Sequence, residues 1–207
     1  GSSSDDASVP ATTGLYAEDV IGLAAHLKIE HAHLVGIGAC IFQEVALRKP
    51  ELVRSLVNTG CWARPDDFFL VQMRTWLEVH EKIGFEAFQR LVVMEAFPAE
   101  FFIEKRDRLL GPQGGWKDLN GHIGLHRRLT EAASTHDTLD RLGEITAPTL
   151  VVHNAMDFLT GPRLTLPVEQ GIPGAQGHTF ANASHVITDR KERAEFAQLL
   201  LGFLAEH

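Results

Sequence analysis

Three positions along the chain could do chemistry together: a glycine turn near residue 38, an aspartate at 157 and a histidine at 185. The turn follows one apolar run, Asp157 follows the apolar run Pro148–His153, and His185 follows the last short apolar segment, Gly177–Ser184. Turn, acid and histidine at successive strand ends give the chain order of a nucleophile, an acid and a histidine. Asp157 alone could be a turn residue and His185 alone a loop residue, but their shared context favours a functional pair.

The first position lies in a strand–turn–helix pattern. Leu34–Ile37 is a short apolar run without alternation, typical of a strand buried on both faces. Ala39–Arg48 has helical spacing and Pro50 cannot continue that helix. Gly36 and Gly38 allow the sharp turn between the two elements. This geometry is that of a nucleophile elbow or of a phosphate-binding turn.

The phosphate-binding alternative is the weaker one. A dinucleotide turn needs a third glycine where Ile41 stands, and an acidic residue about 20 positions on, where Asn58 and Thr59 stand.

Two histidine pairs, His31 with His33 and His122 with His126, could be taken for metal ligands. No acidic or cysteine ligand accompanies either pair, so we expect exposed histidines, no metal and no cofactor.

Composition excludes further classes. A formal net charge of −8 argues against nucleic acid and against an anionic membrane as a partner. The apolar runs are far shorter than the roughly 20 residues of a membrane helix. Cys40 and Cys61 stand in unlike contexts, so we expect reduced cysteines and a cytoplasmic protein.

The elements that must position the three sites alternate between strand and helix, with a helical insertion. Val53–Gly60 is a second strand, so strand, helix and strand make a right-handed parallel crossover. We expect core segments at 1–60 and 146–207 and an insertion at 61–145. Its predicted helices are Phe68–Ile83, Phe85–Phe97, Phe101–Leu110 and Gly121–Ala133. After the insertion come the helices Pro162–Gln170 and Lys191–Leu204.

The insertion is rich in aromatic and other apolar residues. It could simply be helices packing on a sheet, or it could be a lid whose inner face shapes a substrate pocket. In the second case we expect Trp76, Phe85, Phe97 and Phe158 to line that pocket.

Taken together, the sequence resembles the α/β-hydrolases, and most the bacterial esterase, lactonase and C–C-bond hydrolase branch with a helical cap. The resemblance implies an α/β fold: a mostly parallel sheet, helices on both faces and an inserted cap. The matching segments are Tyr16–Val20, His33–Gly36, Glu44–Val53, Ala147–Val152, Asp157–Thr160, Ile172–Ala175 and Ala183–His185.

The resemblance also implies roles. Asp157 would be the triad acid and His185 the base, because a buried carboxylate holds the imidazole tautomer and stabilises the imidazolium. Gly36, Ile37 and Ala39 would form the elbow, with a backbone N–H just after the nucleophile stabilising the oxyanion. The function implied is hydrolysis of an ester, lactone, related carbonyl or C–C bond of a small apolar substrate.

The elbow departs from the family pattern Gly-x-Ser-x-Gly. Without a gap, Gly38 occupies the nucleophile position. Counted back from Gln43–Glu44, Gly38 is instead the last glycine of a motif that lacks two residues, one of them the serine. A modified serine absent from the printed letters would leave a hydrolase, and a true glycine favours a catalytically inactive binding protein. Cys40 is a further candidate nucleophile, although a buried apolar cysteine is commoner.

The start of the chain departs as well. Gly1–Asp5 resembles the loop after the family's fourth strand, so the earlier strands and the oxyanion turn are not seen. The strand at Leu34 would then have an open flank, which is a liability for a buried parallel strand. We expect a separate N-terminal polypeptide to complete the sheet.

Overall fold

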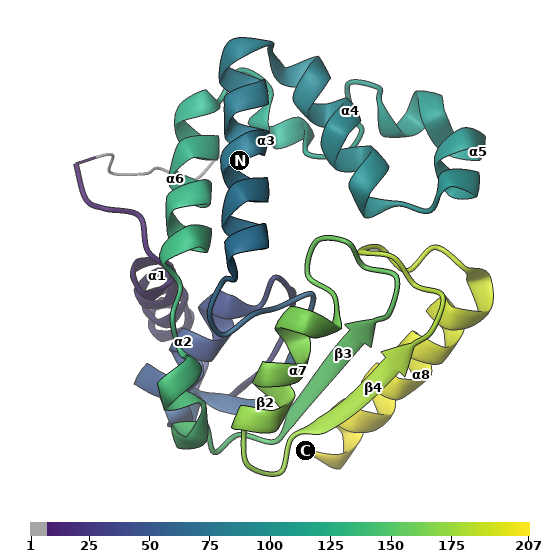
Figure 1. Cartoon of the computed structure of the whole chain (residues 1–207). Helices are drawn as coiled ribbons and strands as arrows, with labels where there is room; N and C mark the ends of the chain where they lie inside the picture. The colour runs from purple at the N-terminus through teal and green to yellow at the C-terminus, as the bar shows by residue number, and fades with distance from the viewer. Residues whose placement is uncertain (1–7) are drawn as a thin grey trace.

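The computed structural model describes residues 8–207, and a parallel sheet with helices around it is its central feature (Figure 1). Neighbouring strands pair in the order β1-β2-β3-β4, all parallel. The predicted α/β fold is thereby confirmed. The segment Gly1–Asp5, which we matched to a family loop, lies outside the described residues. The strands are β1 (Ala32–Ile37), β2 (Val53–Thr59), β3 (Thr149–Asn154) and β4 (Gln176–Phe180).

The helices follow the predicted periodic segments to within a few residues. Four of them, α1, α2, α7 and α8, belong to the strand–helix alternation, and α3 to α6 lie between β2 and β3 in the chain. None of the helices within residues 8–207 is both long enough and apolar enough to cross a membrane. Their bounds are α1 (Thr13–His26), α2 (Cys40–Arg48), α3 (Asp67–Lys82), α4 (Phe85–Ala96), α5 (Ala99–Leu109), α6 (Ile123–Thr135), α7 (Pro162–Gly171) and α8 (Arg190–Glu206).

The two faces of the sheet bury separate apolar clusters. Leu56 and Val151 pack with α1, α2 and α7, whereas their chain neighbours Val57 and Val152 pack with α8. This alternation follows from the two-residue period of a strand. Both central strands are therefore apolar on both faces, as parallel strands covered by helices should be.

Helices α3 to α6, which we call the helical layer, lie beyond the carboxyl ends of β3 and β4 (Figure 1). Asp66 begins α3 by accepting a hydrogen bond from the Phe69 N–H at 2.7 Å. The layer shares one apolar cluster with the core, since Trp76 and Phe88 pack together with Cys40 and Leu159. Apolar side chains of the helical layer therefore cover the carboxyl ends of the strands, where Asp157 and His185 are expected.

Strand β1 does not match the prediction of a strand buried on both faces. Within residues 8–207 it pairs with β2 alone, and only Leu34 of its six residues is buried. Val35 and Ile37 are 39% and 68% exposed. The apolar run correctly predicted a parallel strand, but among residues 8–207 β1 lies at the edge of the sheet, with one side unpaired.

The last strand is also shorter than predicted, ending at Phe180 rather than Ser184. Beyond it, the backbone is redirected by contacts with the loop after β3. The Met156 N–H donates to the Ala183 carbonyl at 3.0 Å, and the Asn154 amide donates to the Ser184 carbonyl at 2.8 Å. These bonds turn the chain toward the loop that carries Asp157.

Candidate active site

Asp157 and His185 meet across the ends of β3 and β4. The carboxylate Oδ2 lies 3.0 Å from Nδ1 of His185, and the side chains are 1% and 14% exposed. The other carboxylate oxygen accepts hydrogen bonds from the N–H groups of Leu159 at 2.7 Å and Thr160 at 3.0 Å. Because Nδ1 is held by the carboxylate, Nε2 is the nitrogen left for a reacting group.

The surroundings of Asp157 favour its charged form. Burial raises the pKa of this carboxyl, but the hydrogen bond and charge of His185, with the two backbone N–H groups, outweigh burial and lower the pKa below its ordinary value. An ionised, hydrogen-bonded carboxylate can hold the imidazole in one orientation.

Two residues that the sequence did not single out complete this arrangement. The hydroxyl of Thr160 donates to Oδ2 of Asp157 at 3.0 Å and lies 3.2 Å from Nδ1 of His185. Gly60, at the end of β2, has φ +52°, and a Cβ there would lie 2.9 Å from the Thr160 hydroxyl and 3.3 Å from Cε1 of His185. A side chain at residue 60 would displace the imidazole, so glycine is required there. The sequence signal that could have identified Gly60 is its position directly after a predicted strand.

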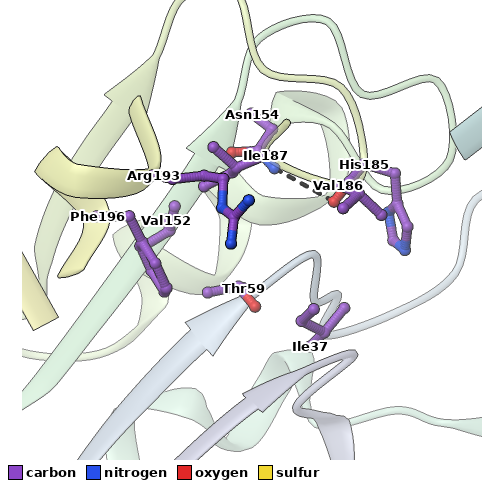
Figure 2. A pocket seen from close by; sticks show the side chains of 9 residues that line it. All are labelled: Ile37, Thr59, Val152, Asn154, His185, Val186, Ile187, Arg193 and Phe196. Atoms are coloured by element: carbon purple, nitrogen blue, oxygen red, sulfur yellow. Dashed lines mark hydrogen bonds between the residues drawn. The ribbon is translucent and has the colours of Figure 1, made fainter. Parts of the chain in front are cut away.

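Asn154 fixes the loop of His185 from the other side. Its amide donates to the carbonyl of Ser184, and at 3.4 Å to the carbonyl of His185 itself (Figure 2). Ile37, from the elbow, lies near the same histidine in this view. The histidine is therefore oriented through its ring and through its backbone.

The elbow has the expected backbone but no reactive side chain. Gly38 has φ +63°, and its N–H donates to the Thr59 carbonyl at 2.8 Å. Apart from the two neighbouring residues, no heavy atom of residues 8–207 lies within 4 Å of the position a Cβ would take. The N–H of Ala39 has no hydrogen-bond partner among residues 8–207. Gly36 is needed for packing, since a Cβ there would lie 2.8 Å from the Phe42 ring. The turn thus offers an unpaired backbone donor beside an empty space.

Cys40 is not placed to replace the missing nucleophile. Its thiol is buried, donates to the Trp62 carbonyl at 3.3 Å, and has a pKa raised well above its ordinary value by burial and then by Cys61. Burial also raises the pKa of the Cys61 thiol to about 12. Both cysteines are free. Neutral, buried thiols are poor nucleophiles.

A cavity of about 220 Å³ joins the elbow to the histidine. It reaches the helical layer, and its lining includes three tryptophans. A second cavity of about 340 Å³ shares Ile37 and His185 with it and extends past Thr59 toward Arg193 and Phe196 (Figure 2). The residues lining the first cavity are Ile37, Gly38, Gly60, Trp62, Phe69, Met73, Trp76, Trp116, Leu159, Thr160 and His185.

The four aromatic residues expected in a pocket occupy different places. Trp76 lines the cavity of Gly38 and His185. Phe97 lines a neighbouring groove with Arg108 and Val186, and Phe158 is half exposed in a shallow depression on the other side of Trp76. The prediction for Phe85 has to be corrected, because its ring packs against His80 and Phe88 inside the helical layer and does not line this cavity. Helical periodicity alone could not separate cavity-facing from layer-facing aromatic residues.

The histidine pairs have other partners. The His31 ring forms a hydrogen bond with the carbonyl of Glu51, and the His33 ring forms one with the hydroxyl of Ser55. His126 pairs with His80, Nδ1 to Nδ1 at 2.9 Å, and not with His122. Within residues 8–207, no three metal-ligating side chains come together.

Comparison with known proteins shows which proteins the chain is similar to. No family model matches the chain. The protein named "Putative carbamate hydrolase RutD" from Rhizobium rhizogenes is 29% identical over 201 residues, covering 95% of this chain and 76% of that protein. A protein of the same name from Agrobacterium fabrum is 30% identical over 173 residues, covering 81% of this chain and 66% of that protein.

Solved structures have the same architecture. An alpha/beta hydrolase enzyme from a Medee basin deep-sea metagenome library superposes with a TM-score of 0.86 at 26% identity, covering 99% of this chain and 76% of that one. The enol-lactonase from Burkholderia xenovorans LB400 superposes with a TM-score of 0.81 at 22% identity, covering 95% and 74% of the two chains. The fold, the order of the functional loops and these relatives identify the chain as a member of the α/β-hydrolase superfamily.

Proposed function

We propose that this chain hydrolyses a carbonyl bond, such as an ester or lactone, of a small apolar substrate, with His185 as general base and Asp157 as its orienting acid. One observation carries the proposal: the hydrogen-bonded set of Asp157, Thr160 and His185 faces the positive-φ turn at Gly38 across a single apolar cavity. An imidazole that can accept a proton, close to an unpaired backbone N–H, can support attack of a nucleophile on a carbonyl carbon.

Because Gly38 offers no side-chain oxygen, the nucleophile in this mechanism is a water molecule in the space beside the turn. His185 Nε2 takes a proton from that water while the water oxygen bonds to the carbonyl carbon. The carbonyl oxygen becomes an oxyanion that the Ala39 N–H stabilises. When the intermediate collapses, the bond to the leaving group breaks, and His185 returns the proton to that group.

The names of the relatives support the reaction class. The relatives similar over most of this chain are named carbamate hydrolases, and a structural neighbour is an enol-lactonase. Carbamates, esters and lactones share a carbonyl carbon bonded to a heteroatom leaving group. The apolar lining of the cavity favours a substrate whose acyl part is apolar.

Variants of the acid and the base test the proposal. In an assay with short-chain nitrophenyl esters, we expect His185→Ala and Asp157→Asn to lower kcat/KM about a hundredfold or more, with little change in Tm. His178→Ala is the matched control, because His178 is a histidine on β4 that pairs with Glu195 on the surface. Equal activity in His185→Ala would exclude His185 as the base.

A second candidate function is binding without turnover, and the bare turn at Gly38 favours it. In that case the cavity would hold a small apolar carbonyl compound reversibly. Calorimetric binding of an ester, with recovery of the intact ester, would support this function over hydrolysis.

A further inference from the structure

A groove lined by cationic side chains adjoins the candidate site. Arg193 of α8 lines the cavity of about 340 Å³ that His185 also lines, and its guanidinium points into that cavity (Figure 2). Arg193 also lines a neighbouring cavity of about 330 Å³, together with Lys105 and Arg108 of α5. We call these two adjoining cavities the cationic groove.

The positive charges of the cationic groove are not neutralised within it. Among residues 8–207, neither cavity is lined by an aspartate or a glutamate. Lys105 pairs with Glu104 at 2.6 Å, but the guanidinium groups of Arg193 and Arg108 have no ion pair or hydrogen-bond partner in the described part of the chain. In a protein with a formal net charge of −8, this groove is a local reversal of charge.

The acidic residues next to these arginines in the chain have other partners. Glu192 precedes Arg193, and its carboxylate accepts a hydrogen bond from the Asn182 N–H at 3.2 Å. Asp107 precedes Arg108, and its carboxylate lies 3.8 Å from the guanidinium of Arg106. The two arginines of the groove are therefore left free to pair with a ligand.

The walls between the charges are apolar. Phe97 and Phe101 line the cavity of Arg108, with their rings stacked at a centroid distance of 5.6 Å. Val186 and Ile187 line both cavities. Charges beside apolar walls are screened less by water than charges on an open surface, and a guanidinium can hold a carboxylate through two parallel hydrogen bonds. An apolar chain that ends in a carboxylate matches these walls and charges.

We propose that Arg193 and Arg108 form a subsite that binds a carboxylate of the substrate, at the end remote from the scissile carbonyl. The inference rests on the proposed function and adds the substrate class: an ester or lactone with a free carboxylate on an apolar chain. His185 lines both the reaction cavity and the cavity of Arg193, so one ligand can extend from the elbow into the cationic groove. The subsite concerns recognition, and the chemical step remains with His185.

A pair of ligands that differ only in one charge tests the subsite. Calorimetry on the full chain would compare adipamate with adipamide, and glutaramate with glutaramide, in each of which a carboxylate is replaced by a neutral amide. We expect at least one acid to bind about tenfold more tightly than its amide. Raising the salt concentration from about 0.01 M to about 1 M should shrink this preference, because the charges are then screened.

Substitutions of the arginines locate the effect. Arg193→Gln and Arg108→Gln should each weaken the preference for the acid, and the double variant should abolish it. Arg74→Gln is the matched control and should preserve it, because Arg74 is an exposed residue of α3 that lines neither cavity and has no ion pair within residues 8–207. Tm should be the same in all these variants, since each changes only a side chain on the surface.

The absence of any preference for the acids in the unmodified chain would overturn the inference. A preference that persists in the double variant would also overturn it. Because these ligands contain no ester, selective binding by a chain that hydrolyses no ester would refute the proposed function and leave the subsite intact. Hydrolysis of monomethyl adipate without any carboxylate preference would support the reaction and refute the subsite.

Discussion

At the scale of single residues, the candidate site combines the hydrogen-bonded pair Asp157 and His185 with a glycine in the turn before α2. Gly38 holds φ +63°, the left-handed region in which a side chain is strained. Among the described residues, no heavy atom outside the two chain neighbours lies within 4 Å of a Cβ position there, so the turn leaves space for a nucleophile but supplies none from Gly38. The proposed mechanism therefore uses a water molecule, activated by His185, in the space beside this turn.

Restoring a serine at the elbow should change the mechanism. We expect Gly38→Ser to form one covalent adduct with a fluorophosphonate probe, because the new hydroxyl would face the His185 side of the cavity. Tm should fall, since a non-glycine residue in this conformation costs about 1–3 kcal/mol. Intact-mass spectrometry gives the readout, and Gly22→Ser, on an uncrowded position of α1, is the control. An unlabelled Gly38→Ser protein that remains folded would contradict the elbow assignment.

Thr160 should act through the acid. Its hydroxyl donates to the oxygen of Asp157 that also faces His185. We expect Thr160→Val to raise the pKa of Asp157 and to lower kcat/KM about tenfold, because the carboxylate loses a donor. Carboxyl NMR titration and the pH profile of kcat/KM measure the two effects.

Thr160→Ser keeps the hydroxyl and should behave like the unmodified chain. A Thr160→Val protein with the original Asp157 titration would show that the hydroxyl only fills space.

At the scale of elements, apolar periodicity predicted the helices well because their buried stripes repeat every three to four residues. It failed where position in the sheet decides burial. The run at Leu34–Ile37 looks the same whether a neighbour strand is present on one side or on two, so the local pattern predicted full burial and only the family resemblance indicated an open flank. The end of β4 was set by long-range bonds from the Asn154 loop, which no local pattern contains.

Within the helical layer, His80 on α3 and His126 on α6 form a pair that should make the layer acid-sensitive. Burial lowers the pKa of His80. Burial, and then the charge of His80, lowers the pKa of His126 to about 4. Below the ordinary histidine pKa of about 6.5, the unfolded chain binds protons that the folded layer refuses. The free energy of unfolding should therefore be highest above about pH 6.5 and should fall as the pH is lowered toward 4.

A double variant, His80→Phe with His126→Phe, should flatten this dependence while the packing with Phe88 is kept. Tm measured from pH 7.5 to pH 5 for both proteins provides the comparison. His136, whose pKa burial also lowers to about 4, should leave a residual slope in the variant. His26→Gln, at an exposed residue near the end of α1, is the control. Identical slopes in all proteins would contradict a role of the pair.

At the scale of the whole molecule, the site is assembled from segments far apart in the chain. The contact between Asp157 and His185 could be predicted, because both residues follow strands in a recognisable order. Gly60 and Thr160 could not be assigned, because their contacts with His185 depend on how separate loops fold over the same strand ends. Sequence patterns report which residues end an element, while contacts between loops appear only once the sheet order is known.

The edge of β1 carries the remaining expectation for the whole molecule. Val35 and Ile37 are exposed on a strand that pairs on one side among residues 8–207, so a second polypeptide completing the sheet stays a prediction. Light scattering across a concentration series should reveal association, and Val35→Lys should weaken it by charging the edge. A monomer at every concentration, with cooperative unfolding, would contradict this expectation.

Ester hydrolysis measured after incubation with a fluorophosphonate tests the proposed mechanism most directly. We expect turnover that requires His185, survives the probe and leaves the protein at its unmodified mass, because water rather than a side chain attacks the carbonyl. Loss of activity together with one covalent adduct would show a side-chain nucleophile and contradict the mechanism. Turnover that is equal in His185→Ala would contradict the site itself.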